Sequence, residues 1–365
     1  MKILYFAPVD WDFIRQRPQH LAERLASFFQ FFYVQPLGLR NLKFSDLNRA
    51  IKRFSILLRK QEPQGRLIIK NLFFFPIINR FTQNLNVNIL RKQIEPLTDN
   101  ETIIWITSPS SLMPDLLSRL HFKALVYEML DDYSKLHPTT KKTIIETETW
   151  LVNKADLIIV TSLALLEKTK RLNKEAALIG NGVDYDFFNT ILPEMPDDLK
   201  GINKIIGYVG SIDKWIDIET ITFLADNRKD LNFVFVGPSK IKSLPIRRNI
   251  HFLGKKDYDT IPHYCNFFDV CLIPFKGGEF ADTINPVKLY EYFALGKPVV
   301  AYEMQELMPF RCLLYLAKDK LDFLDYLKLA MAETDEEVKI RRKEIAKLND
   351  WSVKVKSLVE TLSRL

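Results

Sequence analysis

Residues 285–300 read NPVKLYEYFALGKPVV and carry signals for a helix that runs directly into a buried strand. Asn285 is a favoured helix cap and Pro286 suits a first helical turn, so we predict that the helix starts here. Gly296 is suited to ending the helix, and the Pro-Val-Val after it is typical of the start of a buried strand. A helix followed by a buried strand is a repeating unit of α/β proteins with parallel sheets.

Two charged residues of this predicted helix, Lys288 and Glu291, lie one turn apart on the same face. The free N–H groups at a helix N-terminus form an anion site together with a nearby lysine. A carboxylate one turn deeper can accept hydrogen bonds from hydroxyl groups, such as those of a ribose. The spacing therefore indicates a nucleotide-sugar pocket. A plain ion pair on the surface of a capped core helix explains the same spacing equally well.

Short apolar segments alternate with helical segments along the whole chain, which predicts an α/β fold with open parallel sheets. We expect strands near residues 2–9, 28–35, 66–75, 102–107, 123–130, 156–162, 204–210, 232–238, 249–254, 269–275 and 298–303. We expect helices near residues 17–27, 45–60, 138–153, 163–171, 217–228, 257–267, 285–295, 319–332, 335–348 and 351–364.

The length of 365 residues predicts two domains, and the glycines indicate where they join. Residues 180–182 read Gly-Asn-Gly, which suits a reversal or a hinge, and a Pro-rich acidic stretch follows at 192–200. We therefore predict a first domain over residues 1–182 and a second over 183–350. A surface loop inside one large domain is the alternative.

Composition narrows the class of protein. No run of 18 apolar residues exists, so we expect no membrane-spanning helix. The N-terminal MKILYFAPVDW is typical of a first strand and not of a signal peptide. The three cysteines are few and lie in apolar surroundings, which favours a reducing, cytoplasmic compartment. No Cys/His spacing suggests a metal site, so we expect no metal ion.

Charge is distributed unevenly along the chain. Residues 1–92 contain 16 Lys and Arg against 5 Asp and Glu, an excess of +11, whereas the whole chain carries +7. The remaining residues therefore sum to −4. This asymmetry indicates an anionic partner for one domain only: a membrane surface, a phosphorylated acceptor or a nucleic acid.

Several segments resemble the GT-B glycosyltransferases of the group 1 type, which use nucleotide-sugars. The motif NPVKLYEYFALGKPVVA resembles the donor-binding helix of that family. Residues 155–166 (ADLIIVTSLALL), 179–188 (IGNGVDYDFF) and 206–217 (IGYVGSIDKWID) resemble the last strand and helix of its N-terminal domain, its interdomain crossover, and the first strand and loop of its donor domain. Residues 10–26 (DWDFIRQRPQHLAERLA) resemble a subgroup that builds bacterial cell-surface polysaccharides.

This resemblance implies two Rossmann-like domains whose parallel sheets face each other across a cleft, with residues 351–365 as a helix returning to the N-terminal domain. It implies transfer of a sugar from a nucleotide-sugar to a saccharide acceptor without a bound metal or other cofactor. A nucleotide-sugar epimerase of the same fold is the alternative. The basic charge alone suggests a non-enzymatic nucleic-acid-binding protein, but the motifs of known modules are absent, so we expect no nucleic acid.

The loop after the predicted strand at 204–210 supplies further donor-binding candidates, Gly210, Ser211 and Lys214. A glycine at a strand end lets backbone N–H groups approach a phosphate, and two lysines around a diphosphate would stabilise its charge without a metal. The resemblance places the ribose on Glu291. Many retaining members carry a second carboxylate eight residues earlier, where this chain has Thr283. Thr283 and Asn285 could instead donate to phosphate oxygens, and the choice between retention and inversion stays open.

Inverting transfer needs a base that takes the proton from the acceptor hydroxyl. Asp131 and Asp132 follow the apolar segment KALVYEML, at the strand end where open α/β sheets bind ligands. We favour Asp131 as the base and expect the other aspartate to cap the next turn. His20 is the competing candidate, although a lone histidine there is more often a structural residue.

The basic N-terminal part supplies candidates for acceptor and membrane binding. Arg15 and Arg17 could hold an anionic or lipid-linked acceptor, or could be solvated charges at a helix start. The predicted helix 45–60 combines an apolar stripe with basic residues, and residues 70–80 (KNLFFFPIINR) place aromatic residues between cations. Together these segments indicate peripheral association with an anionic membrane at the cytoplasmic face. A core-facing helix and a buried strand are the alternative.

Overall fold

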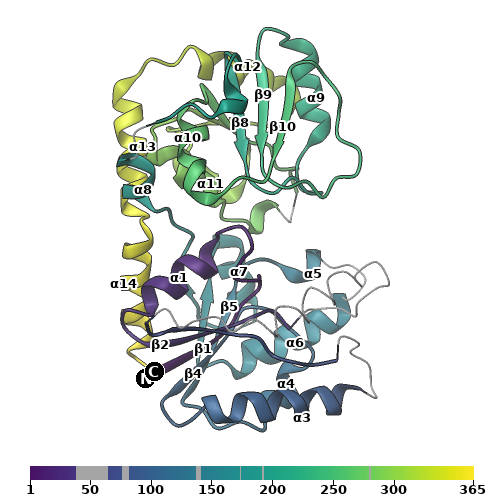
Figure 1. The fold of residues 1–365 in the computed structure, drawn as a ribbon, viewed down its shortest axis with the longest axis vertical. Helices are drawn as coiled ribbons and strands as arrows, with labels where there is room; N and C mark the ends of the chain where they lie inside the picture. Colours follow the sequence, from purple (N-terminus) through teal and green to yellow (C-terminus); the bar gives the residue numbers. More distant parts are fainter. Residues whose placement is uncertain (38–64, 76–81, 137–140, 173, 191–192, 279–280) are drawn as a thin grey trace. The chain divides into compact units, whose positions relative to one another are not determined.

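The computed structural model describes residues 1–37, 65–75, 82–136, 141–172, 174–190, 193–278 and 281–365 (Figure 1). The chain divides into two units, one formed by Met1–Gly180 with Val355–Leu365 and the other by Asn181–Lys354. The chain therefore passes from the first unit into the second between Gly180 and Asn181, inside the Gly-Asn-Gly segment. No helix in the described ranges is long and apolar enough to cross a bilayer.

The first unit is built on a seven-stranded sheet with the order β3-β2-β1-β4-β5-β6-β7, and all of its neighbouring strands are parallel. Its central strands are almost continuously apolar and buried, because helices cover both faces of a parallel sheet. The strands are β1 Lys2–Phe6, β2 Gln30–Val34, β3 Leu67–Lys70, β4 Thr102–Ile106, β5 Ala124–Met129, β6 Leu157–Val160 and β7 Ala177–Leu178.

The helices of this unit divide between the two faces of the sheet. Apolar residues of α3, α4, α6 and α7 form one core with alternate strand residues such as Leu4, Ile104 and Tyr127 (Figure 1). Helix α1 packs on the opposite face, where Tyr5, Trp105 and Glu128 point. The helices are α1 Arg17–Leu25, α3 Thr82–Ile94, α4 Met113–Leu117, α5 Tyr133–Leu136, α6 Lys141–Lys154 and α7 Leu163–Arg171, with a 3₁₀ turn η2 at Glu95–Leu97.

The second unit is built on a six-stranded parallel sheet with the order β10-β9-β8-β11-β12-β13. The strands are β8 Ile205–Val209, β9 Asn232–Val236, β10 Ile250–Gly254, β11 Val270–Ile273, β12 Val299–Tyr302 and β13 Tyr315–Ala317. The helices are α8 Tyr185–Thr190, α9 Ile218–Asn227, α10 Ile261–Asn266, α11 Val287–Ala294, α12 Lys320–Met331 and α13 Glu336–Leu348, with 3₁₀ turns η4 Asp197–Leu199, η5 Tyr258–Thr260, η6 Ala281–Thr283 and η7 Gln305–Phe310.

Helix α14, Trp351–Leu362, continues from the second unit into the first. Its buried stripe consists of Trp351, Val355, Leu358 and Leu362, which recur every three or four residues as one face of a helix requires. Val353 belonged to the predicted apolar stripe but is 47% exposed. The unit division places Val355–Leu365 with the first unit.

The α/β architecture with parallel sheets is confirmed, whereas six of the described helices and strands were not predicted: α3, α4, α5, α8, β7 and β13. Helix α3 buries the polar Asn86 beside Val87, Leu90 and Ile94, so its apolar pattern is weak. Strands β7 and β13 have only two and three residues at sheet edges. The predicted strand at 66–75 ends at Lys70. The predicted helix at 45–60 lies outside the described residues.

Candidate active site

In the second sheet the strand order reverses between β8 and β11, and open α/β sheets bind ligands at the carboxyl ends of strands beside such a point. Two loops meet there through backbone hydrogen bonds. Asp217 N donates to Pro274 O at 2.8 Å, and Lys276 N donates to Trp215 O at 2.7 Å. The loop that carries Ser211 and Lys214 therefore borders the place where this fold binds ligands.

Two glycines bring the ends of β8 and β9 into close contact. Gly210 and Gly237 have φ values of +149° and +147°, and a Cβ on Gly237 would lie 1.9 Å from Gly210 O. The N–H of Gly210 already donates to Val236 O at 2.9 Å. Gly210 therefore cannot offer its own N–H to a phosphate, and its role in the loop is to allow the close approach of Gly237.

Ser211 is the residue of this loop whose side chain most clearly lacks a partner. Its Oγ atom is buried and makes no hydrogen bond. A buried hydroxyl without a partner costs free energy unless a ligand or water completes it. Lys214 is exposed on the same loop, and its N–H donates to Asp213 Oδ1 at 2.7 Å.

Asn285 does not cap helix α11, contrary to our prediction. The helix begins at Val287 with Pro286 as N-cap, and no side chain caps it. Asn285 instead accepts a hydrogen bond from Asn181 N at 2.9 Å, and its carbonyl accepts one from Asn181 Nδ2 at 2.6 Å. Its own Nδ2 donates to Glu306 Oε2 at 2.7 Å. Its side chain is thus committed to fixing the start of α11 and is not available to phosphate.

Lys288 and Glu291 form the ion pair that their spacing suggests, with Nζ and Oε2 2.7 Å apart. The pair is not a solvated surface contact, because the side chains are 20% and 5% exposed. Tyr292, the next residue on α11, accepts a hydrogen bond from Val209 N at 2.9 Å and so anchors the helix to the end of β8. Thr283 is also buried, in the 3₁₀ turn η6 before the helix.

In the first unit, Asp131 and Asp132 have different surroundings at the end of β5. Asp132 is buried and accepts hydrogen bonds from Ser134 Oγ at 2.6 Å and from Lys168 Nζ at 3.2 Å. Asp131 is half-buried, and its carboxylate bonds no side chain among the described residues. Burial, with the Asp132 charge adding to it, raises the pKa of Asp131 to about 7.

The other candidates of the first unit are held in contacts within it. His20 is 2% exposed, and its Nδ1 lies 3.3 Å from Arg24 Nη1, which supports a structural role. Arg15 pairs with Glu23, with Nη1 donating to Oε1 at 2.9 Å. Arg17 is 3% exposed and is therefore not a solvated charge at the helix start.

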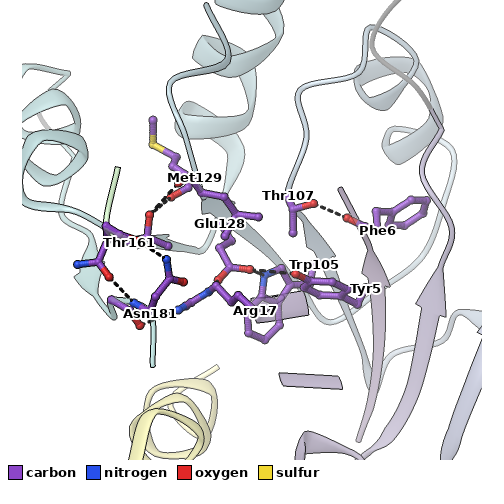
Figure 2. Close-up of polar contacts among 12 residues, drawn as sticks. Tyr5, Phe6, Arg17, Trp105, Thr107, Glu128, Met129, Thr161 and Asn181 are labelled. Carbon is purple, nitrogen blue, oxygen red and sulfur yellow. Dashed lines mark hydrogen bonds and ion pairs between the residues drawn. The ribbon is translucent and has the colours of Figure 1, made fainter. Parts of the chain in front are cut away.

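Glu128 was missed by the sequence reasoning and is the partner of Arg17. Figure 2 shows Arg17, Trp105 and Tyr5 meeting on its carboxylate: Arg17 Nε donates at 2.7 Å, Trp105 Nε1 at 3.0 Å and the Tyr5 hydroxyl at 3.4 Å. Arg17 Nη1 also donates to Gly180 O at 2.7 Å. The sequence does contain a signal for this buried pair, because an acidic residue in the otherwise apolar strand ALVYEM needs a buried partner.

The described residues contain no group of three or more His, Cys, Asp or Glu side chains arranged to hold a metal ion. Two of the elements that border the candidate donor site carry a lysine, Lys214 on the loop after β8 and Lys288 on α11. This arrangement can neutralise a diphosphate through side-chain charge and hydrogen bonds.

Two Rossmann-like α/β units with parallel sheets are the architecture of GT-B glycosyltransferases, and residues 203–312 match the family model described as glycosyl transferases group 1. The chain is a glycosyltransferase of the GT-B type, as the sequence resemblance implied. A curated relative is TuaH of Bacillus subtilis (strain 168), assigned as a teichuronic acid biosynthesis glycosyltransferase. It is 26% identical over 390 aligned residues, which cover 95% of this chain and 93% of TuaH.

Two solved structures share the fold. Sucrose-phosphate synthase from Thermosynechococcus elongatus aligns with a TM-score of 0.72 and 15% identity over 95% of this chain and 91% of that one. HepE of Anabaena, solved in complex with UDP and glucose, aligns with a TM-score of 0.69 and 16% identity over the whole of both chains. The comparisons support the glycosyltransferase prediction and give no support to the epimerase.

Proposed function

We propose that the enzyme transfers a sugar from a nucleotide-sugar, bound by the second unit, to a lipid-linked saccharide acceptor in cell-surface polysaccharide synthesis. The donor class is supported by HepE, whose structure contains UDP and glucose. The acceptor class is supported by the assignment of TuaH to teichuronic acid biosynthesis and by the resemblance of residues 10–26.

The observation that carries the donor assignment is the buried Lys288–Glu291 pair on α11. Lys288 would bind the diphosphate, and Glu291 would bind the ribose hydroxyls. Each side chain would then give up part of its present contact with the other in favour of the ligand. The unpartnered Ser211 Oγ would donate to a phosphate oxygen, and Lys214 would add charge. These side chains stabilise the departing diphosphate directly, so the proposal includes no metal ion or other cofactor.

Asp131 is the proposed general base of an inverting reaction. The acceptor hydroxyl gives its proton to the Asp131 carboxylate while its oxygen forms a bond to the anomeric carbon. The bond from that carbon to the nucleoside diphosphate breaks, and the electron pair leaves with the phosphate. A carboxyl whose pKa is about 7 suits proton transfer near neutral pH. Asp132 is already engaged by Ser134 and Lys168, which leaves Asp131 as the better candidate.

Membrane association is proposed for the first unit at the cytoplasmic face. Phe73 and Phe75 are 41% and 42% exposed and lie edge to face with ring centroids 5.8 Å apart. Helix α3 holds their backbone: Phe73 N donates to Gln93 Oε1 at 2.9 Å, and Phe75 N donates to Asn86 Oδ1 at 2.7 Å. The two exposed rings on a fixed backbone suit insertion into a membrane. They lie within residues 1–92, whose excess of 11 positive charges would attract an anionic membrane surface. No nucleic-acid partner is proposed.

A melt screen followed by a transfer assay tests this function. One of the UDP-, GDP-, dTDP- or ADP-sugars should raise the melting temperature, and the same donor should label a lipid-linked acceptor. Asp131→Asn should keep the melting shift but lower transfer by about 10²–10⁴-fold. Asp115→Asn is the matched control, because Asp115 lies on α4 of the same unit and bonds Gln83. Donor turnover without an acceptor would favour the epimerase.

A further inference from the structure

The backbone of the loop after β8 is fixed on both sides of Ser211. Gly210 N donates to Val236 O, at the end of β9, and Ile212 N donates to Pro238 O, each at 2.9 Å. The amide groups that flank Ser211 are therefore tied to the neighbouring strand and its loop. The Ser211 hydroxyl between them is buried and bonds none of the described residues. A fixed backbone restricts the directions in which such a side chain can point.

Tyr208, on β8, completes the support of Ser211 from inside the unit. Its hydroxyl donates to Ser211 O at 3.2 Å, and the residue is 2% exposed. The ring lies edge to face with Phe275, at a centroid distance of 6.5 Å, and packs against Phe235 of β9 at 6.1 Å. Gly210 also makes room for the hydroxyl, because a Cβ at Gly210 would lie 2.6 Å from the Tyr208 oxygen. The core of the second unit thus sets the position of this hydroxyl.

We propose that Tyr208 is a positioning residue for the nucleotide-sugar: its hydroxyl fixes the Ser211 carbonyl, so that the Ser211 hydroxyl is oriented to donate to a phosphate oxygen. The inference rests on the proposed role of Ser211 in donor binding. Tyr208 acts through Ser211, because its own hydroxyl hydrogen is already used by the Ser211 carbonyl. A group that is oriented before binding loses less conformational freedom on binding, so it contributes more to affinity.

Tyr208→Phe removes the hydroxyl and keeps the ring. Calorimetric titration with the nucleotide-sugar found in the melt screen should show a loss of affinity of about tenfold, the effect of one neutral hydrogen bond. Tyr315→Phe is the matched control in the same unit. Its hydroxyl donates to Glu333 Oε2 at 2.9 Å, at the amino end of β13, whereas the donor loops follow the carboxyl ends of the strands. The control therefore loses a tyrosine hydrogen bond and should keep the donor affinity of the wild type.

A double-mutant cycle shows whether Tyr208 acts through Ser211. Ser211→Ala removes the proposed phosphate contact, so it should weaken donor binding on its own. Tyr208→Phe combined with Ser211→Ala should then bind the donor as well as Ser211→Ala alone, because no hydroxyl remains to be oriented. Losses that add in the double variant would overturn the inference, because Tyr208 would then affect the donor without Ser211.

Replacing Tyr208 by 4-fluorophenylalanine carries the test if Tyr208→Phe does not fold. The fluorine fills the space of the hydroxyl but donates no hydrogen bond, so the core keeps its packing. Donor affinity should again fall by about tenfold. Wild-type affinity in either folded variant would overturn the inference.

These outcomes separate the inference from the function on which it rests. Wild-type protein that binds no nucleotide-sugar would refute the proposed function and the inference together. Unchanged affinity in Ser211→Ala would remove the phosphate contact, and the inference with it, while leaving the assignment of Lys288 and Glu291 intact. Donor binding that weakens in Ser211→Ala but not in Tyr208→Phe would refute the inference alone.

Discussion

At the scale of single residues, Glu291 combines burial with an ion pair to Lys288, and we expect it to be the main donor contact. Glu291→Gln keeps the shape but weakens hydrogen bonds from ribose hydroxyls. A lost charge-assisted bond costs about 1.5–3 kcal/mol, which corresponds to a loss of donor affinity of about 10- to 100-fold. Calorimetric titration with the nucleotide-sugar found in the melt screen measures this loss. Glu344→Gln, at an exposed position of α13, is the control. Unchanged affinity in Glu291→Gln would refute the ribose assignment.

The Arg17–Glu128 pair is a second feature at this scale, and its burial predicts a large energetic effect (Figure 2). Arg17→Met leaves the buried Glu128 carboxylate without its cation, and Glu128→Gln leaves the buried Arg17 guanidinium without its anion. Each substitution should therefore lower the free energy of unfolding of the first unit by about 3–5 kcal/mol. Combining the two substitutions should cost clearly less than their sum.

Urea denaturation of the two single variants and the double variant measures the coupling between Arg17 and Glu128. Arg91→Met is the matched control: Arg91 pairs with Glu95 at the surface, with side chains 44% and 49% exposed, and such pairs contribute about 0–1 kcal/mol. Strict additivity of the two buried substitutions would show that the pair does not act as a unit.

At the scale of elements, helix α14 supports the first unit through its last turns. Leu358 is fully buried, whereas Val353 of the same helix is 47% exposed. Leu358→Ala should destabilise the first unit by about 2–5 kcal/mol, and Val353→Ala should stay within about 0.5 kcal/mol of the wild type. Thermal melts with and without the nucleotide-sugar separate the two units, since the ligand stabilises only the unit that binds it. Equal effects of the two substitutions would contradict this packing.

At the scale of the whole molecule, the charge asymmetry predicts binding to anionic membranes through the first unit. The protein should float with anionic vesicles at low salt and be released as salt rises, with roughly 1 kcal/mol contributed per basic residue near the surface. Phe73→Ser with Phe75→Ser should weaken binding at every salt concentration, because insertion of the exposed rings is lost.

Charge reversal tests the electrostatic part of this binding. Changing Lys52, Arg53, Arg59 and Lys60 to Glu, all outside the described residues, should abolish flotation and leave donor affinity unchanged. The matched control reverses four exposed basic residues of the other unit, Lys229, Lys242, Arg248 and Lys318. Wild-type protein that stays in solution at low salt would exclude the membrane and leave a soluble acidic acceptor as the partner of the basic segment.

The sequence by itself determined most of the buried strands and the class of protein. Apolar runs of four to six residues predicted the buried parallel strands, because both faces of such a strand lie under helices. The spacing of Lys288 and Glu291 placed them on one face of a helix and left an ion pair between them as one of two interpretations, because residues three apart meet on a helix surface. These features depend on neighbours within one or two turns, and that information is contained in local periodicity.

Only the tertiary structure decided which polar residues are paired and which are available. Glu128 meets Arg17 across 111 residues, and Asn285 meets Asn181 across 104, so neither partner can be read from local spacing. Asp131 and Asp132 are adjacent and chemically identical, and they differ because Lys168 and Ser134 reach only one of them. Packing between distant segments sets burial and hydrogen bonding, and these in turn set which carboxylate is a fixed charge and which can take a proton.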